Sequence, residues 1–217
     1  MGRITLICTT HRESGKCNEQ ELLKILLAVG PEVIFEEIRP ADIESSYVDE
    51  SKYNLEMRAI REYMKVKKAQ QVPVDDYEIP EDFGPHMQAL DEFVESVTGT
   101  YRDAMGEMCR KQFELGFGYL NSSAFVSSFK ESERLYQETV FKHGNDLARI
   151  KLSEWNDQIH KRDASMLGNI YRFCQQTDFM EGAFLVGAGH MLSIMDGIER
   201  RIKDQPTLVT WRFWNGP

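Results

Sequence analysis

Two histidines and several carboxylates of this sequence stand where apolar runs end. His11 follows the run ITLIC, and His190 follows the run AFLV through the glycine-rich turn GAGH. Glu36 and Glu37 end VIFEEI, and Asp75 ends VPVD. An imidazole can exchange a proton near neutral pH or ligate a metal, and a carboxylate can orient it or share the ion. These residue types therefore indicate acid–base or metal-assisted chemistry.

The apolar runs are typical of buried strands, and helical patterns separate them. Strands are expected at 3–10, 33–38, 72–75, 183–188 and 207–213, and the helices between them at 18–30, 51–70 and 191–203. Strands that alternate with helices favour a mostly parallel sheet with crossover connections. Ligands bind beyond the carboxyl ends of such strands. His11, Glu37 and His190 are thus expected to share one rim of the sheet.

Residues from about 86 to 176 carry apolar side chains at helical spacing, without strand-like runs. This block is too long to be a single crossover, so we interpret it as an insertion that packs over the sheet. The expected fold class is α/β, a mostly parallel central sheet flanked by helices, with a large helical insertion before the last β-α-β unit. We expect a single domain over residues 1–217.

The composition excludes several classes of protein. A net charge of −9 and the lack of a basic stripe argue against a nucleic-acid partner. No apolar run approaches the ~20 residues that span a bilayer, and the N-terminus does not fit a signal peptide. The four cysteines form no CxxC motif, and a zinc site from Cys8, His11 and Cys17 would lack a fourth ligand. Reduced thiols and a cytoplasmic location are expected.

Gly187 and Gly189 surround the turn that presents His190. Glycine allows a tight turn and a close approach of the backbone to a neighbour or a ligand. The turn would place His190 at the head of the next helix, where the helix N-terminus lowers the pKa of an imidazole and keeps it neutral. Alternatively, the two glycines serve only the close packing of strand against helix.

Arg162 and Asp163 form a charged pair in the segment KRDASMLGNI. Apolar residues follow at helical spacing, at Met166, Ile170 and Phe173. The spacing alone favours Asp163 as the cap of a helix that starts here, with Arg162 as a flexible surface side chain.

Three segments, taken together and in order, resemble the TraB/PrgY/Tiki superfamily, which includes erythromycin esterase-like and ChaN-like proteins. They are THRES…PEVIFEEIRP, KRDASMLGNI and FLVGAGHMLSI. Members share a histidine after the first strand, a glutamate at the end of the second, an Arg-Asp/Asn helix start and a late Gly-x-His. The residues of this sequence that match the pattern are His11, Glu37, Arg162, Asp163 and His190. Glu36 is the alternative to Glu37. Cys8 stands where the Tiki and TraB branch usually has glycine.

The resemblance implies hydrolysis of an ester or a peptide bond. Tiki-type proteins resemble metal-dependent peptidases, and erythromycin esterases use His and Glu to activate water without a firm metal requirement. In such a hydrolase Glu37 is the general base, His11 and His190 orient the water or hold a divalent Zn, Mn or Fe ion together with Glu37, and Arg162 stabilises an oxyanion. Further binding residues at the same rim are Glu36, Asp163, Asp75, Gly187 and Gly189.

Two other functions stay open on the sequence. The rim could belong to a non-catalytic domain that binds a metal, haem, as ChaN-like proteins do, or another small ligand. The helical block could present an apolar face to a partner or a second copy, through Phe113, Phe117, Tyr119, Phe125 and Phe129, although burial is the commoner fate of such residues. We expect a small-molecule or peptide substrate, no nucleic-acid or membrane partner, and leave a homo-oligomer open.

Overall fold

The computed structural model describes residues 2–78, 80, 83–204 and 208–216. Its strands form one five-stranded sheet in the order β3-β2-β4-β1-β5, and all the pairings are parallel. The strands are β1 (Gly2–Thr9), β2 (Val33–Glu36), β3 (Gln70–Pro73), β4 (Glu181–Gly187) and β5 (Val209–Phe213). The predicted α/β fold with a parallel central sheet is confirmed. The predicted start of the last strand, Thr207, lies outside the described residues.

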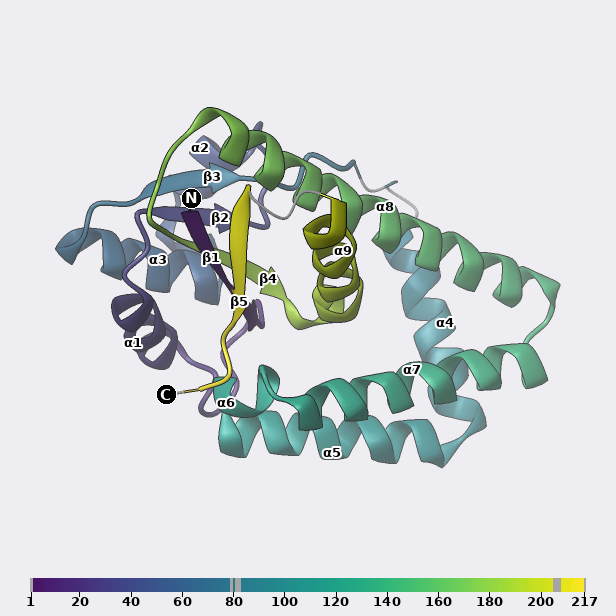
Figure 1. Ribbon diagram of the computed structural model, residues 1–217. Helices are drawn as coiled ribbons and strands as arrows, with labels where there is room; N and C mark the ends of the chain where they lie inside the picture. The colour runs from purple at the N-terminus through teal and green to yellow at the C-terminus, as the bar shows by residue number, and fades with distance from the viewer. Residues whose placement is uncertain (1, 79, 81–82, 205–207, 217) are drawn as a thin grey trace.

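Helices cover both faces of the sheet (Figure 1). The helical elements are α1 (Glu19–Val29), α2 (Ile43–Ser46), η1 (Glu50–Lys52), α3 (Leu55–Val66), α4 (Phe83–Val97), α5 (Gly99–Leu115), α6 (Phe117–Leu120), α7 (Ser123–His143), α8 (Asp146–Gln176), η2 (Ala188–His190) and α9 (Met191–Asp204). Helices α1 and α3 pack together, as do α8 and α9. Alternation along β1 directs Thr9 toward α3 and Cys8 toward Met191 of α9, so the two helix pairs lie on opposite faces.

The helical block between β3 and β4 was predicted as an insertion, but most of it extends away from the sheet and does not pack over it (Figure 1). It has a small core of its own, in which Leu90, Val94, Val140 and Leu152 are buried. Helix α8 belongs to both parts of the molecule. Its first half contributes Leu152 to this small core, while its second half packs against the sheet with buried apolar side chains such as Ile170. A rigid helix of 31 residues thus connects the insertion to the sheet.

The helix boundaries follow local capping. Asn18 caps α1 by accepting a hydrogen bond from the Glu21 backbone N–H at 3.1 Å. The helix ends at Gly30, whose φ of 65° is the left-handed conformation that glycine favours. The predicted helix over 51–70 is shorter, because Asn54 caps α3 and holds its start at residue 55.

Strand β3 lies two residues earlier than predicted, at Gln70–Pro73. Val74 and Asp75 still donate backbone hydrogen bonds to Glu36 and Ile38, so the chain remains beside β2 after the strand ends. This continued pairing carries the Asp75 side chain to the carboxyl edge of the sheet.

The thiols and most of the aromatic residues of the insertion are structural. All four cysteines are free. Burial raises the pKa of the Cys8 and Cys17 thiols to about 12, so both are neutral core groups. Buried in the main core are Phe117, Tyr119 and Phe125, while Phe129 packs at its edge and Phe113 is exposed. Among the described residues, no helix is long and apolar enough to span a membrane.

Candidate functional site

The carboxyl edge of the sheet brings together residues from four separate segments. His11 follows β1, Glu37 follows β2, and His190 ends the η2 turn after β4. Arg162 reaches the same place from the middle of α8. Glu37 Oε1 lies 2.6 Å from Arg162 Nη2, 3.3 Å from His190 Nε2 and 3.9 Å from His11 Nε2. Three of the four residues that the sequence predicts as catalytic therefore surround the carboxylate of the fourth, Glu37.

Glu37 is anchored through both of its carboxylate oxygens. Oε1 accepts a hydrogen bond from Arg162, and Oε2 accepts one from the backbone N–H of Gly187 at 2.7 Å. Burial alone would raise the pKa of Glu37, but the hydrogen bond from His190 and the charges of His190 and Arg162 lower it to about 2. A carboxylate with so low a pKa is a weak base. Its geometry suits it to holding neighbouring groups in position.

Arg162 is a fixed, mostly buried side chain. Its Nε and Nη2 atoms donate to Asp75 Oδ2 at 2.9 and 2.6 Å, and Nη2 also donates to Glu37. The prediction of a flexible surface arginine beside a helix cap was wrong. No helix starts here, because α8 is capped 18 residues earlier by Asn145 and runs through the pair without interruption. The first half of α8 packs within the insertion, so the sequence pattern did not show that one helix runs from residue 146 to residue 176.

Asp163 is buried and positions His190. Its Oδ1 atom lies 2.5 Å from His190 Nδ1, and its side chain is 2% exposed. Burial would lower the pKa of His190, but the hydrogen bonds to Asp163 and Glu37 outweigh it and raise the pKa to about 9. The predicted lowering by a helix N-terminus was wrong, since two carboxylates act on the ring more strongly than the helix dipole.

The raised pKa makes His190 an imidazolium at neutral pH. It then donates Nδ1–H to Asp163 and Nε2–H to Glu37. Arg162 Nη1 lies 3.1 Å from the same Nε2 atom. This contact becomes a hydrogen bond when His190 gives up its Nε2 proton, because the nitrogen then has a lone pair to accept it. The neutral and cationic forms of His190 both have partners in the site.

His11 has a carboxylate partner that the sequence did not reveal. Its Nδ1 atom lies 3.4 Å from Glu56 Oε1, and the Thr9 hydroxyl donates to that oxygen at 2.5 Å. The hydrogen bond to Glu56 raises the pKa of His11. Unlike His190, whose side chain is 8% exposed, His11 is 54% exposed. Glu56 lies in the first turn of α3, where an acidic residue is common for helix stability alone, so its position gave no signal.

Three of the site's carboxylates have an oxygen atom without a partner. Among the described residues, Glu56 Oε2, Asp75 Oδ1 and Asp163 Oδ2 are buried and accept no hydrogen bond. Each such group costs about 1–3 kcal/mol of folding free energy. With Glu37 these make four carboxylates at the site, and the guanidinium of Arg162 contacts two of them, Glu37 and Asp75. The sum of these five charges is −3 while both imidazoles are neutral. The excess negative charge favours protonated imidazoles or a cationic ligand.

Glu36 lies outside this network. Neighbouring side chains along a strand alternate between faces, and Glu36 points to the α3 side of the sheet. There it accepts hydrogen bonds from the Tyr47 hydroxyl at 2.6 Å and from Gln71 Nε2 at 2.9 Å. Burial raises its pKa to about 7. Of the two adjacent glutamates, Glu37 is therefore the one that reaches His11, Arg162 and His190.

The two glycines before His190 have different roles. A Cβ atom on Gly187 would lie 3.1 Å from His11 Nε2 and 3.3 Å from Glu37 Oε2, which is closer than ordinary contact. A side chain at position 187 would therefore require His11 or Glu37 to shift by a few tenths of an ångström. A Cβ atom on Gly189 would meet no atom within 4 Å. Close packing of strand against helix therefore does not explain Gly189, which lines the cleft described next.

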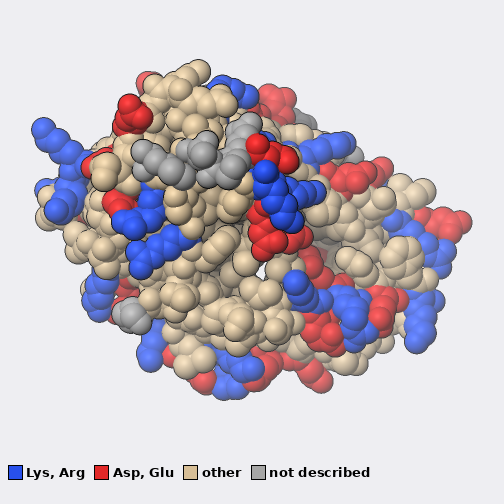
Figure 2. Space-filling view, viewed as in Figure 1, with Lys and Arg blue, Asp and Glu red and all other residues tan. Residues whose placement is uncertain are grey.

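An open cleft of about 750 Å³ gives access to the site. His11, Arg162, Gly189 and His190 line its inner end, and side chains of α7 and α8, such as Trp155, line the opposite wall. Figure 2 shows the surface hollowed between α9 and α7, with acidic and basic side chains around the opening. The volume is in the range of small-molecule sites. The insertion therefore forms one wall of the cleft, and the edge of the sheet forms the other.

The geometry does not fit a divalent ion shared by His11, Glu37 and His190. Arg162 is 2.6 Å from Glu37 Oε1 and 3.1 Å from His190 Nε2, so its guanidinium stands where a shared ion would bind. Within the described part of the chain, no group of three or more His, Cys, Asp or Glu side chains is arranged to hold a metal. The expected Zn, Mn or Fe ion stays a prediction.

The raised pKa of His190 gives a pH-dependent contribution to stability. The folded pKa of about 9 lies above the ordinary 6.5, so the contribution is complete below pH 6.5 and is lost as the pH rises through 9. We expect the loss of unfolding free energy in His190→Gln to be largest near pH 6 and to shrink toward pH 10. Urea unfolding across this range measures it. His143→Gln, a change at an exposed histidine, is the control. A loss of unfolding free energy in His190→Gln that is the same at all pH values would contradict the assignment.

Comparison with known proteins gives no relative. No family model matches the chain, and neither the curated proteins nor the solved structures contain a match. The resemblance to the TraB/PrgY/Tiki superfamily consequently stays an expectation. What the protein does must be inferred from the chemistry of the cleft.

Proposed function

We propose that the protein is a hydrolase of ester or peptide bonds, in which His11 and His190 act as the acid–base pair. The observation that carries this proposal is the meeting of two imidazoles, each held by a buried carboxylate, around Glu37 at the end of an open cleft. Two titratable groups with different environments and exposure are the usual basis of acid–base catalysis. Membership of the TraB/PrgY/Tiki superfamily is part of the same proposal.

His11 is the general base. It is the more exposed imidazole, and Glu56 accepts its Nδ1–H, which leaves the Nε2 lone pair for a water molecule in the cleft. As the water oxygen bonds to the carbonyl carbon, the water proton passes to His11 Nε2. Glu56 and Thr9 fix the orientation of the ring, in the role that a buried carboxylate has beside other catalytic histidines.

His190 is the general acid. At neutral pH it holds a proton on Nε2, and this atom faces Glu37 and Arg162 at the inner end of the cleft. When the bond from the carbonyl carbon to the leaving oxygen or nitrogen breaks, His190 gives that atom its proton. Nε2 of the neutral ring then accepts a hydrogen bond from Arg162 Nη1, which replaces the hydrogen bond that Nε2–H donated to Glu37. His11 then returns its proton to solvent and His190 takes one up from solvent, which completes the cycle.

Glu37 takes a role that differs from the expected general base, whereas Arg162 keeps the expected role of stabilising an oxyanion. Glu37, whose pKa is about 2, positions Arg162 and His190 and does not act as the base. Arg162 has five N–H donors, and four are directed at Asp75, Glu37 and His190. The remaining Nη1–H is available to the substrate carbonyl oxygen, where it would stabilise the developing negative charge.

A second candidate is a non-catalytic domain that binds a small ligand at the same cleft. The excess of carboxylates and the three partnerless oxygens favour it, because a bound cation would satisfy them without any reaction. Binding of haem or a metal belongs to this candidate. In either case we propose a cytoplasmic protein, supported by four free thiols.

The hydrolase is tested with p-nitrophenyl esters of small and aryl acids and with peptide p-nitroanilides. Protein purified without added metal is assayed as such, after EDTA treatment, and with added Zn²⁺, Mn²⁺ or Fe²⁺. We expect metal-independent release of product that is absent in the double variant His11→Ala/His190→Ala. Equal turnover by the double variant would place the activity elsewhere. Stabilisation by ligands, without turnover of any substrate, would replace the hydrolase with the binding domain.

A further inference from the structure

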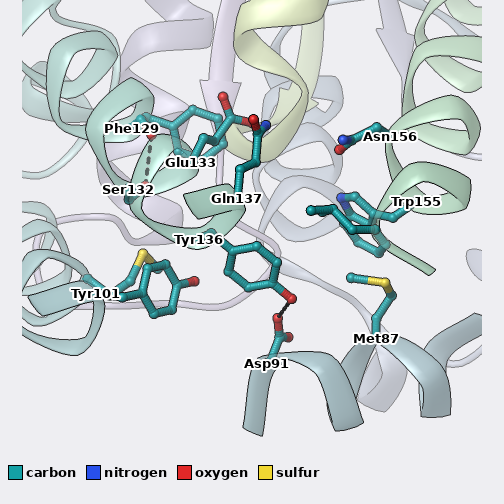
Figure 3. Close-up of a pocket in the computed structure, with 12 residues that line it drawn as sticks. Met87, Asp91, Tyr101, Phe129, Ser132, Glu133, Tyr136, Gln137, Trp155 and Asn156 are labelled. Atoms are coloured by element: carbon teal, nitrogen blue, oxygen red, sulfur yellow. Dashed lines mark hydrogen bonds between the residues drawn. The ribbon is translucent and has the colours of Figure 1, made fainter. Parts of the chain in front are cut away.

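A second cavity lies inside the helical insertion, beside the cleft. It is open to solvent on one side and has a volume of about 180 Å³ where α4, α5, α7 and α8 meet. Figure 3 shows Met87, Tyr101, Tyr136 and Trp155 directed toward the same space from these four helices. A cavity of about 150 Å³ lined by apolar side chains is large enough to bind benzene. The size therefore suits one ring or a branched group of similar volume.

The aromatic walls of this cavity are held by neighbouring rings. Trp155 stacks on Phe83, with 4.9 Å between centroids and 6° between the planes. Tyr101 meets the edge of Tyr136 at 5.3 Å. All four of these aromatic residues pack against the small core of the insertion. Since the rings support one another, the cavity is formed before any ligand enters, and little ordering is needed on binding.

The charged groups of the cavity are both acidic. Asp91 accepts a hydrogen bond from the Tyr136 hydroxyl at 2.8 Å through Oδ1, and Glu133 lies at the side nearer the cleft (Figure 3). Among the described residues that line the cavity there is no Lys, Arg or His. Two carboxylates together with the faces of Trp and Tyr rings attract an organic cation, by charge and by cation–π interaction.

We propose that this cavity is a binding subsite for a ring-sized apolar group that carries a positive charge, such as a benzylic or cyclic ammonium group. A neutral apolar group would fill the volume but would not interact with the charges of Asp91 and Glu133. An anionic group would be repelled by both. A cationic one satisfies the carboxylates and the aromatic faces together.

The cavity continues into the cleft. Five residues line both spaces, namely Phe129, Glu133, Gln137, Trp155 and Asn156. On α8, Trp155 and Arg162 are seven residues apart, which places them on one helix face and separates them by roughly 10 Å. As the subsite of a substrate, a role that rests on the proposed function, the cavity would hold a cationic end while the scissile carbonyl lies near His11 and Arg162.

Binding of benzyltrimethylammonium by calorimetry tests the subsite, with benzyl alcohol as the neutral probe and phenylacetate as the anionic one. We expect the cation to bind at least tenfold more tightly than either. Asp91→Asn keeps an acceptor for the Tyr136 hydroxyl and should weaken binding of the cation about three- to tenfold. Asp103→Asn, an exposed change on α5, should leave it unchanged. Trp155→Ala, or Trp155→Leu if alanine prevents folding, should weaken it more than tenfold.

Equal binding of cation and neutral probe, or wild-type affinity in both Asp91→Asn and the Trp155 variant, would overturn the subsite. These measurements need no turnover, so the two proposals fail separately. Hydrolysis of simple esters without binding of the cation would remove the subsite and leave the hydrolase. Binding that depends on Asp91 and Trp155, without hydrolysis of any substrate, would support the subsite and overturn the hydrolase.

Discussion

Replacement of His11 by alanine is expected to lower kcat for ester hydrolysis by about 10²- to 10⁴-fold, with little change in KM. The variant removes the imidazole that faces the cleft, while the carboxylate that holds it, Glu56, stays in place. His190→Ala should reduce kcat to a similar extent for substrates with poor leaving groups, because these need protonation as the bond breaks. It should have a smaller effect on p-nitrophenyl esters, whose leaving group departs without a proton. Steady-state kinetics with matched aryl and alkyl esters measures both effects.

Substitution of Glu56 tests whether this carboxylate positions His11 and sets its pKa. The carboxylate raises the pKa of His11, so Glu56→Gln should shift the ascending limb of the pH profile of kcat/KM to lower pH. A merely structural role would leave that limb in place. His143→Ala, at the exposed end of α7, is the matched control and should keep wild-type kinetics. Wild-type kcat in His11→Ala would disprove the assignment of the base.

Replacement of Arg162 by methionine is expected to reduce the free energy of unfolding by about 3–5 kcal/mol. The long side chain is retained, but Glu37 and Asp75 lose the cation that both of them contact at 2.6 Å. Their side chains are 7% and 6% exposed, so water cannot replace it. Removal of one partner from a buried ion pair costs far more than the pair itself contributes, because an uncompensated charge remains. Urea denaturation at pH 7 measures the loss.

Arg134→Met on α7 provides the matched control. Arg134 pairs with Glu131 and Glu138, but these side chains are half exposed and solvent screens the pairs, so the expected loss is much smaller than that for Arg162→Met. A loss for Arg162→Met no larger than that for Arg134→Met would show that the site does not depend on this cation.

Local physics made much of the fold predictable from the sequence. Runs such as ITLIC are too apolar and β-branched for an exposed segment, and their alternation with helical patterns requires crossovers between parallel strands. The parallel arrangement then places everything that follows a strand at one edge. For this reason His11, Glu37 and His190 could be predicted to lie together, and the helical insertion could be bounded to within a few residues.

Tertiary structure alone decided the partners of these groups and their protonation. Nothing local distinguishes Glu56 from an ordinary acid in a first helical turn, or Arg162 and Asp163 from a surface cap. Their burial depends on α3 and α8 packing across opposite faces of the sheet. The pKa of His190 is raised because two carboxylates from distant segments outweigh both burial and the helix N-terminus. The periodicity of apolar residues in the sequence determines which face of a helix or strand a residue occupies. Its charge state depends on the charged groups that the fold brings within a few ångströms of it.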